Sequence, residues 1–231
     1  MYFYGRNSFN AALDKQSVAK VYIRKDDPLI KSLKSKRIKY QLLSTKELDH
    51  LAGTNKHQGI VFEKKREYQL YELNDIINQK YELIVILDSL KDPHNLGAIL
   101  RTCDAIGVDG IIYKKHHSVS LNDTVAKVST GAIEYVKCVE VSNLNNTIDK
   151  LKKEGYWIVG LEADADRYYT EIDYKMKLAI VLGSEGEGIS HLLSKNLDFK
   201  IKLPLNGHVN SLNVSNAAAI CLYHIYENRK Q

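Results

Sequence analysis

The sequence lacks the features of a membrane protein or a secreted protein. No apolar run approaches the roughly 18 residues that a membrane-spanning helix needs. The first residues do not follow the basic-then-apolar layout of a secretory signal. Cysteine is scarce, and Cys103, Cys138 and Cys221 stand at core-like positions without the spacing of a disulfide framework. These absences predict a cytoplasmic protein with reduced cysteines and no membrane partner.

Several signatures of common enzymes are also missing. No G-x-G-x-x-G follows a predicted strand, which argues against a nicotinamide dinucleotide. The glycine-rich loop at 183–188 lacks the Lys-Ser/Thr ending of a P-loop, and its carboxylates, Glu185 and Glu187, would repel phosphate. His116 and His117 are adjacent and diverge, and no Cys or His pair has ligand spacing, so we expect no metal site. No Ser/His/Asp arrangement can be recognised either.

Positive charge is concentrated at one end of the chain. Residues 1–66 contain 15 Lys and Arg against 6 Asp and Glu, a net charge of +9, whereas residues 67–231 contain 18 against 22, a net charge of −4. A solvated surface explains this division in ordinary terms. The alternative is a module that binds a polyanion, joined to a domain that carries out chemistry.

The basic end has the pattern of a small α/β domain, assigned to residues 1–66. Ser44-Thr-Lys-Glu47 has the spacing of a capping box, and Gly53 ends the helix that follows. The charged stretch at 64–69 has no apolar periodicity and predicts a linker, assigned to residues 67–80. The other predicted elements of this domain are helices at 7–15 and 28–34 and strands at 18–23, 38–43 and 58–63.

The rest of the chain, residues 81–231, has the alternation of strands and helices that favours a mainly parallel sheet. Leu83–Leu87 is a continuous apolar run, as expected for a strand buried on both faces. A helix opened by Asn95 and ended by Gly107 follows it, and Gly97 allows a close approach to that helix. Further strands are predicted at 110–113, 136–141, 156–161, 178–182 and 199–203, with helices at 144–153, 189–194 and 216–227.

Three polar segments follow predicted strands, where ligands bind in open α/β sheets. They are Asp92-Pro-His-Asn-Leu-Gly-Ala-Ile-Leu-Arg101, Gly183-Ser-Glu-Gly-Glu-Gly188 and Leu203-Pro-Leu-Asn-Gly-His-Val-Asn-Ser-Leu-Asn-Val-Ser215. Taken singly, the first is explained by a capped helix with a surface arginine, and Ser211 by an ordinary helix cap. Three such segments in one domain predict an enzyme site.

The three segments, in this order and spacing, resemble the motifs of the SpoU (TrmH-type) RNA 2′-O-methyltransferases. Tyr4-Gly-Arg-Asn7 and His57-Gln-Gly-Ile-Val61 resemble the accessory RNA-binding domain of the RlmB-like branch, which methylates a guanosine of 23S ribosomal RNA. The resemblance covers essentially the whole chain. It departs from the family pattern at Cys103, at Asn216 and in the stretch Gly207-His-Val-Asn210.

The resemblance implies a SPOUT fold, in which a trefoil knot at the C-terminal end of the sheet binds S-adenosylmethionine. It also implies a homodimer whose sites are completed by the partner subunit. By the same resemblance, Arg101 lies near the ribose hydroxyl, and hydrogen bonds orient it, the ribose and the cofactor. The residues expected to make these bonds are Asn95, Glu185, Ser211 and Asn213, and those expected to contact the cofactor are Gly183, Leu203 and Leu212.

The expected function is therefore transfer of a methyl group from S-adenosylmethionine to a guanosine 2′-hydroxyl of 23S ribosomal RNA. The nearer alternative is the same reaction on a tRNA or on another ribosomal nucleotide. The farther ones are a non-catalytic RNA-binding homologue and a nucleotide-binding α/β protein of unrelated activity. Arg6 and the His57-Gln58 pair are expected to meet RNA, unless they are turn residues that serve only folding.

Overall fold

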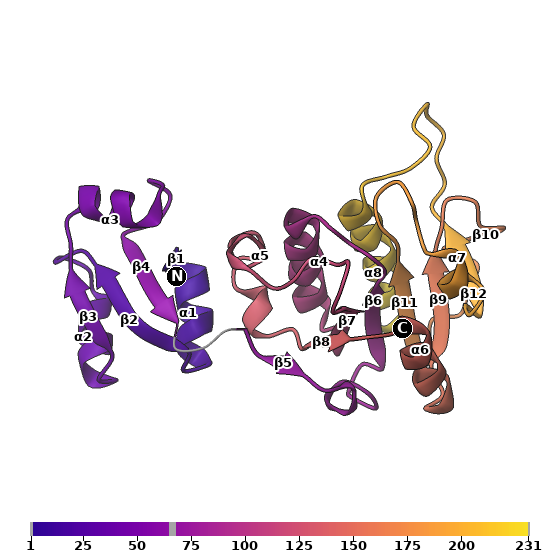
Figure 1. The fold of residues 1–231 in the computed structure, drawn as a ribbon, viewed down its shortest axis with the longest axis horizontal. Coiled ribbons are helices and arrows are strands. Elements are labelled where there is room, and N and C mark those ends of the chain that lie inside the picture. The colour runs from indigo at the N-terminus through magenta and orange to yellow at the C-terminus, as the bar shows by residue number, and fades with distance from the viewer. Residues whose placement is uncertain (1, 65–67, 231) are drawn as a thin grey trace.

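The computed structural model describes residues 2–64 and 68–230, which form two sheets with helices packed against them (Figure 1). The N-terminal sheet is built from β1 (Tyr2–Tyr4), β2 (Val18–Ile23), β3 (Lys39–Leu42) and β4 (Ile60–Lys64), in the order β1-β4-β2-β3. Strand β4 runs antiparallel to β1 and β2, and β3 runs parallel to β2. Three helices connect the strands, α1 (Arg6–Asp14), α2 (Leu29–Ser35) and α3 (Thr45–Ala52).

The capping box predicted before α3 is confirmed. The Glu47 backbone N–H donates to Ser44 Oγ, and the Glu47 carboxylate accepts from the Ser44 backbone N–H at 2.7 Å. Gly53 ends the helix in the left-handed region, at φ 64°. In the loop His57-Gln-Gly59, His57 is buried and Gln58 is exposed. His57 Nδ1 accepts from the Gly59 backbone N–H at 2.9 Å, and its Nε2 lies 3.0 Å from Asp49 Oδ1.

The second sheet is parallel throughout its described strands, in the order β10-β12-β9-β11-β6-β7-β8-β5. Its strands are β5 (Leu70–Tyr71), β6 (Leu83–Leu87), β7 (Gly110–Lys114), β8 (Cys138–Val141), β9 (Trp157–Leu161), β10 (Arg167–Tyr168), β11 (Leu178–Leu182) and β12 (Phe199–Lys202). The central pair, β6 and β11, is buried at every position. The mainly parallel α/β sheet expected from the apolar runs is confirmed.

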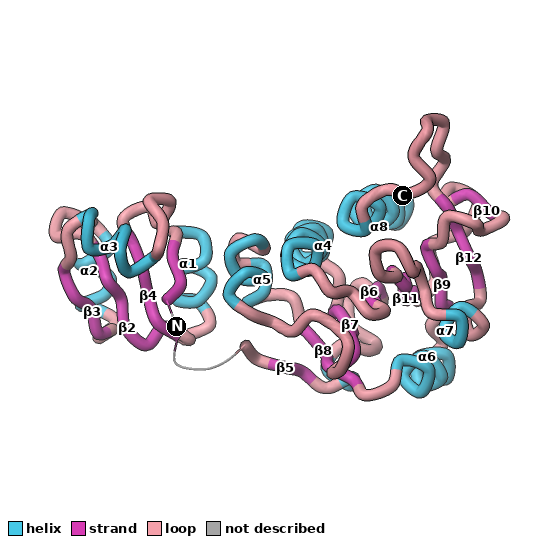
Figure 2. Tube along the Cα trace, turned by 45° about the horizontal axis from the view of Figure 1, so that its top comes forward, coloured by secondary structure: helices cyan, strands magenta, loops and turns pink. Residues whose placement is uncertain are grey.

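Helices cover both faces of this sheet (Figure 2). Val85 and Leu87 pack with α4 (Pro93–Ile106) and α8 (Val214–Lys230) on one face. Ile84 and Ile86 point to the other face, where α6 (Leu144–Lys153) and α7 (His191–Ser194) lie. The remaining elements are α5 (Asp123–Val128) and two 3-10 turns, η1 (Leu73–Asp75) and η2 (Ala132–Glu134).

Helix α4 starts earlier than the sequence indicates. Its N-cap is Asp92, whose Oδ1 accepts from the His94 backbone N–H, and Pro93 takes the first helical position. The expectation that Asn95 opens this helix is therefore wrong, and Asn95 is free to use its side chain elsewhere. Gly97 is needed for packing: a Cβ there would lie 2.6 Å from Val128 Cβ on α5.

The segment expected to link the domains takes part in the second sheet. Strand β5 pairs with β8, and Ile76 is fully buried against Gly110, where a Cβ would lie 2.5 Å from an Ile76 methyl. Residues 65–67, which include the middle of the charged stretch at 64–69 and the predicted domain boundary, lie outside the described residues. All three cysteines are buried and free. Within 2–64 and 68–230, the helices are too short or too polar to cross a membrane.

Candidate active site

The three polar segments meet at one edge of the second sheet. Because its strands are parallel, the carboxyl ends of β6, β11 and β12 lie on the same side of the molecule. β6 and β11 are neighbours, and β12 is joined to β11 through β9. The loop after β12 projects well beyond this edge before the chain enters α8 (Figures 1 and 2).

Asn95 is the centre of a hydrogen-bond network that joins all three segments. Its Nδ2 donates to Asp92 Oδ2 at 3.1 Å and to Glu185 Oε1. Its Oδ1 accepts from Asn213 Nδ2 at 3.0 Å. Asn95 is buried, so these hydrogen bonds are shielded from solvent. Leaving one of its polar groups unpaired in this environment would be costly. Asn95, Glu185 and Asn213, all predicted as site residues, therefore form one unit.

Asn213 also orders the start of α8. Its Oδ1 accepts from the Ser215 backbone N–H at 2.9 Å and from Ser215 Oγ at 2.6 Å. The alternative in which Ser211 caps this helix is wrong, because Asn213 takes that role. Ser211 is exposed and makes no hydrogen bond within the part of the chain that the structure describes. The structure thus brings Asn213 into the network and leaves Ser211 outside it.

The Gly183 loop is closed by its own backbone. Ser184 and Gly188 exchange two backbone hydrogen bonds, at 3.0 and 3.1 Å. Gly183 lies directly beneath this closure, because a Cβ there would stand 2.1 Å from the Gly188 carbonyl carbon and 2.3 Å from its oxygen. The result is a tight loop whose residues 185–188 are exposed to solvent.

Leu203 and Leu212, both expected to contact the cofactor, flank the long loop after β12. Leu203 is half-buried directly after the strand, and Leu212 is exposed just before α8. Their contribution to a ligand would be through backbone groups and apolar surface.

Asp88, a buried carboxylate next to the first polar segment, is not among the residues predicted from the sequence. It follows β6 directly and is fully buried, and its carboxylate accepts from Lys114 Nζ at 2.8 Å and from the Ser190 backbone N–H at 2.8 Å. Burial acts to raise the pKa of this carboxyl, but the bonds from Lys114 and Ser190 outweigh burial and hold the pKa below its ordinary value. Asp88 thereby ties β7 to the chain that leaves the Gly183 loop. The position of Asp88 directly after an apolar strand is the sequence feature that could have identified it.

Arg101 lies apart from the Asn95 network. It is six residues further along α4, roughly 9 Å along the helix axis at 1.5 Å per residue. Its side chain is exposed and makes no hydrogen bond or ion pair with the described residues. Instead it lines a cleft against the N-terminal domain, described below. The expectation that Asn95 and Glu185 orient Arg101 directly stays a prediction.

Two of the residues expected to meet RNA have structural roles in the N-terminal domain. His57 is buried and is held in the turn before β4 by Asp49 and Gly59, and its contact with RNA stays a prediction. The Arg6 guanidinium pairs with the buried Asp27, whose other oxygen accepts from the Leu29 backbone N–H. Gln58 is exposed and accepts from the Arg6 backbone N–H at 2.8 Å, which fixes the start of α1.

Both halves of the chain match known families. Residues 82–223 match the SpoU rRNA methylase family, and residues 2–69 match the RNA 2′-O ribose methyltransferase substrate-binding family. The chain belongs to the SpoU family. The family resemblance expected from the three motifs is confirmed, and so is the expectation of an RNA methyltransferase.

Individual relatives agree with this placement over most of the chain. A TrmH family tRNA/rRNA methyltransferase of Staphylococcus epidermidis is 42% identical over 230 residues, covering 97% of this chain and 90% of the relative. The SpoU methyltransferase AviRb from Streptomyces viridochromogenes, solved with AdoMet, has a TM-score of 0.85 at 21% identity, covering 100% of this chain and 90% of AviRb. A TrmH/SpoU tRNA modifying enzyme of A. aeolicus is 31% identical, covering 67% of this chain and 79% of that one, with a TM-score of 0.61.

This SpoU-family chain shows no cluster of metal ligands among the residues described: no three His, Cys, Asp or Glu side chains gather as they would around an ion. Glu185 is used by Asn95, and Asp88 by Lys114 and Ser190. What the site offers is a set of amide and carboxylate groups at the sheet edge and an exposed arginine beyond them. Such a set can position and polarise a substrate.

Proposed function

We propose that the protein transfers the methyl group of S-adenosylmethionine to the 2′-hydroxyl of a guanosine in 23S ribosomal RNA. The observation that carries the proposal is the Asn95 network, which joins the loops after three parallel strands into one rigid edge. An in-line displacement needs its two partners held in one geometry, and a rigid edge provides that.

The Gly183 loop fits the cofactor better than it fits a phosphate. Gly183 lets the loop close tightly on its own backbone, and the loop carries carboxylates that would attract a cationic sulfonium. We assign cofactor contacts to Gly183, Leu203 and Leu212, largely through backbone groups. When bound, the cofactor supplies an activated methyl group. The AdoMet complex of AviRb supports this choice of donor through the shared fold.

Arg101 is assigned to the ribose hydroxyl. An arginine side chain is effectively never neutral in a protein, so a role as a proton acceptor is hard to support. A positive charge beside the hydroxyl stabilises the alkoxide that develops as the methyl group is attacked, with or without help from a substrate phosphate. Asn95, Glu185, Ser211 and Asn213 are assigned to orient the ribose and the cofactor.

We infer further that the protein works as a homodimer with a C-terminal trefoil knot. Support for a second copy comes from α8, where Ile220 and Tyr223 are 43% and 47% exposed on a helix that otherwise packs against α4. An exposed apolar helix face suits a symmetric partner. A ribosomal RNA substrate also implies the cytoplasm as the place of action.

Methyl transfer to RNA from a strain that lacks this protein tests the proposal. Labelled S-adenosylmethionine is supplied with ribosomal RNA and, separately, with tRNA, and the labelled nucleoside is identified after digestion. We expect 2′-O-methylguanosine in 23S ribosomal RNA. Better transfer to tRNA would replace the ribosomal assignment with the tRNA alternative, which the 31% identity to the A. aeolicus tRNA modifying enzyme favours. Label in neither RNA would leave a non-catalytic RNA-binding role.

A further inference from the structure

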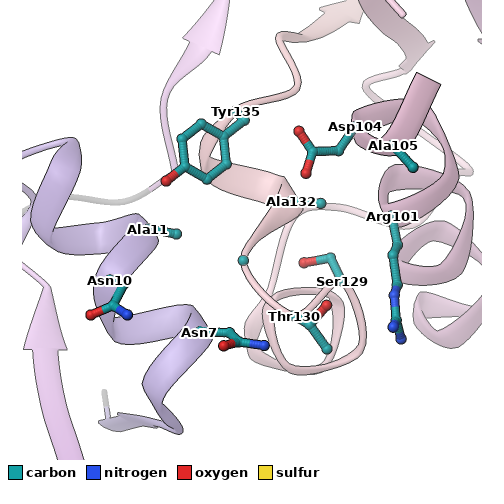
Figure 3. A pocket seen from close by; sticks show the side chains of 11 residues that line it. Asn7, Asn10, Ala11, Arg101, Asp104, Ala105, Ser129, Thr130, Ala132 and Tyr135 are labelled. Carbon is teal, nitrogen blue, oxygen red and sulfur yellow. The ribbon is translucent and has the colours of Figure 1, made fainter. Parts of the chain in front are cut away.

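A cleft of about 400 Å³ separates the two domains beside Arg101 (Figure 3). One wall is α1, with Asn7, Asn10 and Ala11. The other wall is formed by α4 and by the turn between α5 and η2. In Figure 3, Asn7 extends toward this turn, and Arg101 runs down on the turn's other side. The remaining lining residues are Asp104, Ala105, Ser129, Thr130, Gly131, Ala132 and Tyr135.

The cleft has a fixed shape because the two domains are docked at its floor. A Cβ at Gly131 would stand 3.1 Å from Ala11 Cβ, and Gly131 has φ 104°, which favours glycine. Tyr135 Oη donates to Asp14 Oδ2 at 2.9 Å, across the domain boundary. The hydrophobic core also runs without a break from Phe9 in the first domain into the second. The walls are therefore held at a set spacing.

Side chains in the cleft suit a nucleobase better than a phosphate. Tyr135 is 45% exposed, and its bond to Asp14 fixes the orientation of its ring. The Lys15 ammonium lies over the ring, 5.4 Å from its centroid, so a base would stack on the opposite face. Asn7 brings an amide with both donors and an acceptor, and Thr130 brings a hydroxyl. Both side chains are exposed, and neither has a side-chain hydrogen bond within the described residues. Asp104 would repel a phosphate but accepts readily from the N–H groups of a base.

Thr130 is held in a conformation that threonine rarely adopts. Its φ is 51°, in the left-handed region, where a β-branched residue is a true outlier. Such a conformation costs on the order of 1–3 kcal/mol and persists where the surroundings impose it, often at binding sites. Here the strain presents the threonine side chain between Asn7 and Arg101 (Figure 3).

We propose that this cleft binds one unpaired base of the substrate RNA, stacked on Tyr135 and hydrogen-bonded by Asn7 and Thr130. The ribose to be methylated then lies at Arg101, on the same wall. Unpaired bases stacked on aromatic rings and read on their edges are the usual targets of sequence-specific RNA binding. The inference rests on the proposed function, and it adds that both domains read the nucleotide together.

A pair of Tyr135 variants tests stacking. Tyr135→Phe keeps the ring and loses the bond to Asp14, whereas Tyr135→Leu loses the ring. With in vitro transcribed 23S ribosomal RNA at raised salt, we expect Tyr135→Leu to weaken binding about 10-fold, within the range for one stacked base. Tyr135→Phe should bind within about twofold of the unaltered protein, a difference of under about 0.5 kcal/mol. Equal losses in both variants would mean that Tyr135 only docks the domains, and would overturn the proposal.

Asn7→Ala tests recognition of the base edge, with Asn146→Ala as the matched control. Asn146 is also an exposed asparagine in the first turn of a helix, but it stands on α6, outside the cleft. We expect Asn7→Ala to raise the KM for RNA about fivefold, as for loss of one hydrogen bond of about 1 kcal/mol. It should also spread methylation to further nucleotides, with cofactor affinity unchanged. The same KM and methylation pattern in both variants would contradict base reading.

Failure of the proposed function would be seen separately. If the unaltered protein binds 23S ribosomal RNA without methylating it, the proposed function fails. The RNA affinities of the Tyr135 and Asn7 variants then still test the cleft proposal. If it methylates RNA and the variants behave like the unaltered protein, only the cleft proposal falls. If it neither binds nor methylates RNA, both proposals fail.

Discussion

Replacing Gly183 by alanine tests the geometry of the Gly183 loop. Gly183 has no left-handed φ, so an added methyl group brings no backbone strain of its own. Its effect is purely steric: the new Cβ would stand 2.1 and 2.3 Å from the Gly188 carbonyl group and 2.3 Å from the Ile189 nitrogen. These are backbone atoms, which cannot rotate out of the way. The loop closure between Ser184 and Gly188 must therefore open or shift.

The size of the effect follows from known cases of overpacking. Forcing an extra methyl group into packed surroundings typically costs about 1–3 kcal/mol, and a backbone clash belongs at the upper end. In a chain of this length, that corresponds to a fall in Tm of roughly 2–12 °C. Because the shifted backbone is the part assigned to the cofactor, affinity for S-adenosylmethionine should fall by about 10-fold or more.

Gly207→Ala is the matched control, because a Cβ at Gly207 meets no described atom within 4 Å and its φ is not left-handed. Thermal unfolding and calorimetric titration with S-adenosylmethionine measure both effects in each variant. Gly207→Ala should resemble the unaltered protein in both. If Gly183→Ala unfolds and binds cofactor as Gly207→Ala does, the steric argument and the cofactor assignment are both refuted.

Three further predictions concern buried polar groups. Asn95→Ala removes the amide at the centre of the network. We expect the single-turnover rate of methyl transfer to fall about 100-fold. The free energy of unfolding, measured by urea denaturation, should fall by about 1–3 kcal/mol. Asp88→Asn should also destabilise the protein. The folded-state pKa of Asp88 lies below its ordinary value, so the ionised carboxylate stabilises the unaltered protein fully above about pH 4. This stabilisation is lost as the pH falls further, so the free energies of unfolding of Asp88→Asn and the unaltered protein should converge in acid. Lys64 is paired with Glu134, and burial nevertheless lowers its pKa to about 8. The unfolded chain therefore holds this proton more tightly, and the stability of the fold should rise between pH 8 and the ordinary lysine value of 10.5. Lys64→Met should flatten that rise in denaturation curves, and an unchanged slope would contradict the assignment.

Elements with a strong local signal could be predicted from the sequence. The apolar runs of β6 and β11 and the helix at Leu144–Lys153 have the predicted bounds, because periodicity and caps agree there. The prediction that α4 begins at Asn95 places its start too late, because proline is favoured at the first helical position and Pro93 takes it. β5 and β10 have two residues each, which is too short for any pattern, and only pairing with a neighbour makes them strands.

The site could be predicted in part for the same reason. Polar segments after buried strands predict a site at this sheet edge, and the family resemblance assigns Asn95, Glu185 and Asn213 to it. The parallel sheet brings these three residues together. The partners of Asp88 could not be foreseen, because Lys114 and Ser190 come from distant parts of the chain. The cleft beside Arg101 depends on how one domain docks on the other, which no local pattern encodes.

The central claim is that Arg101 serves the attacking hydroxyl while the sheet-edge loops hold the cofactor. Single-turnover methyl transfer and cofactor titration of Arg101→Ala test it most directly. We predict a rate at least about 100-fold lower, as for loss of one stabilising group in a transition state, with S-adenosylmethionine affinity within a few-fold of the unaltered protein. A near-normal rate for Arg101→Ala would contradict the account.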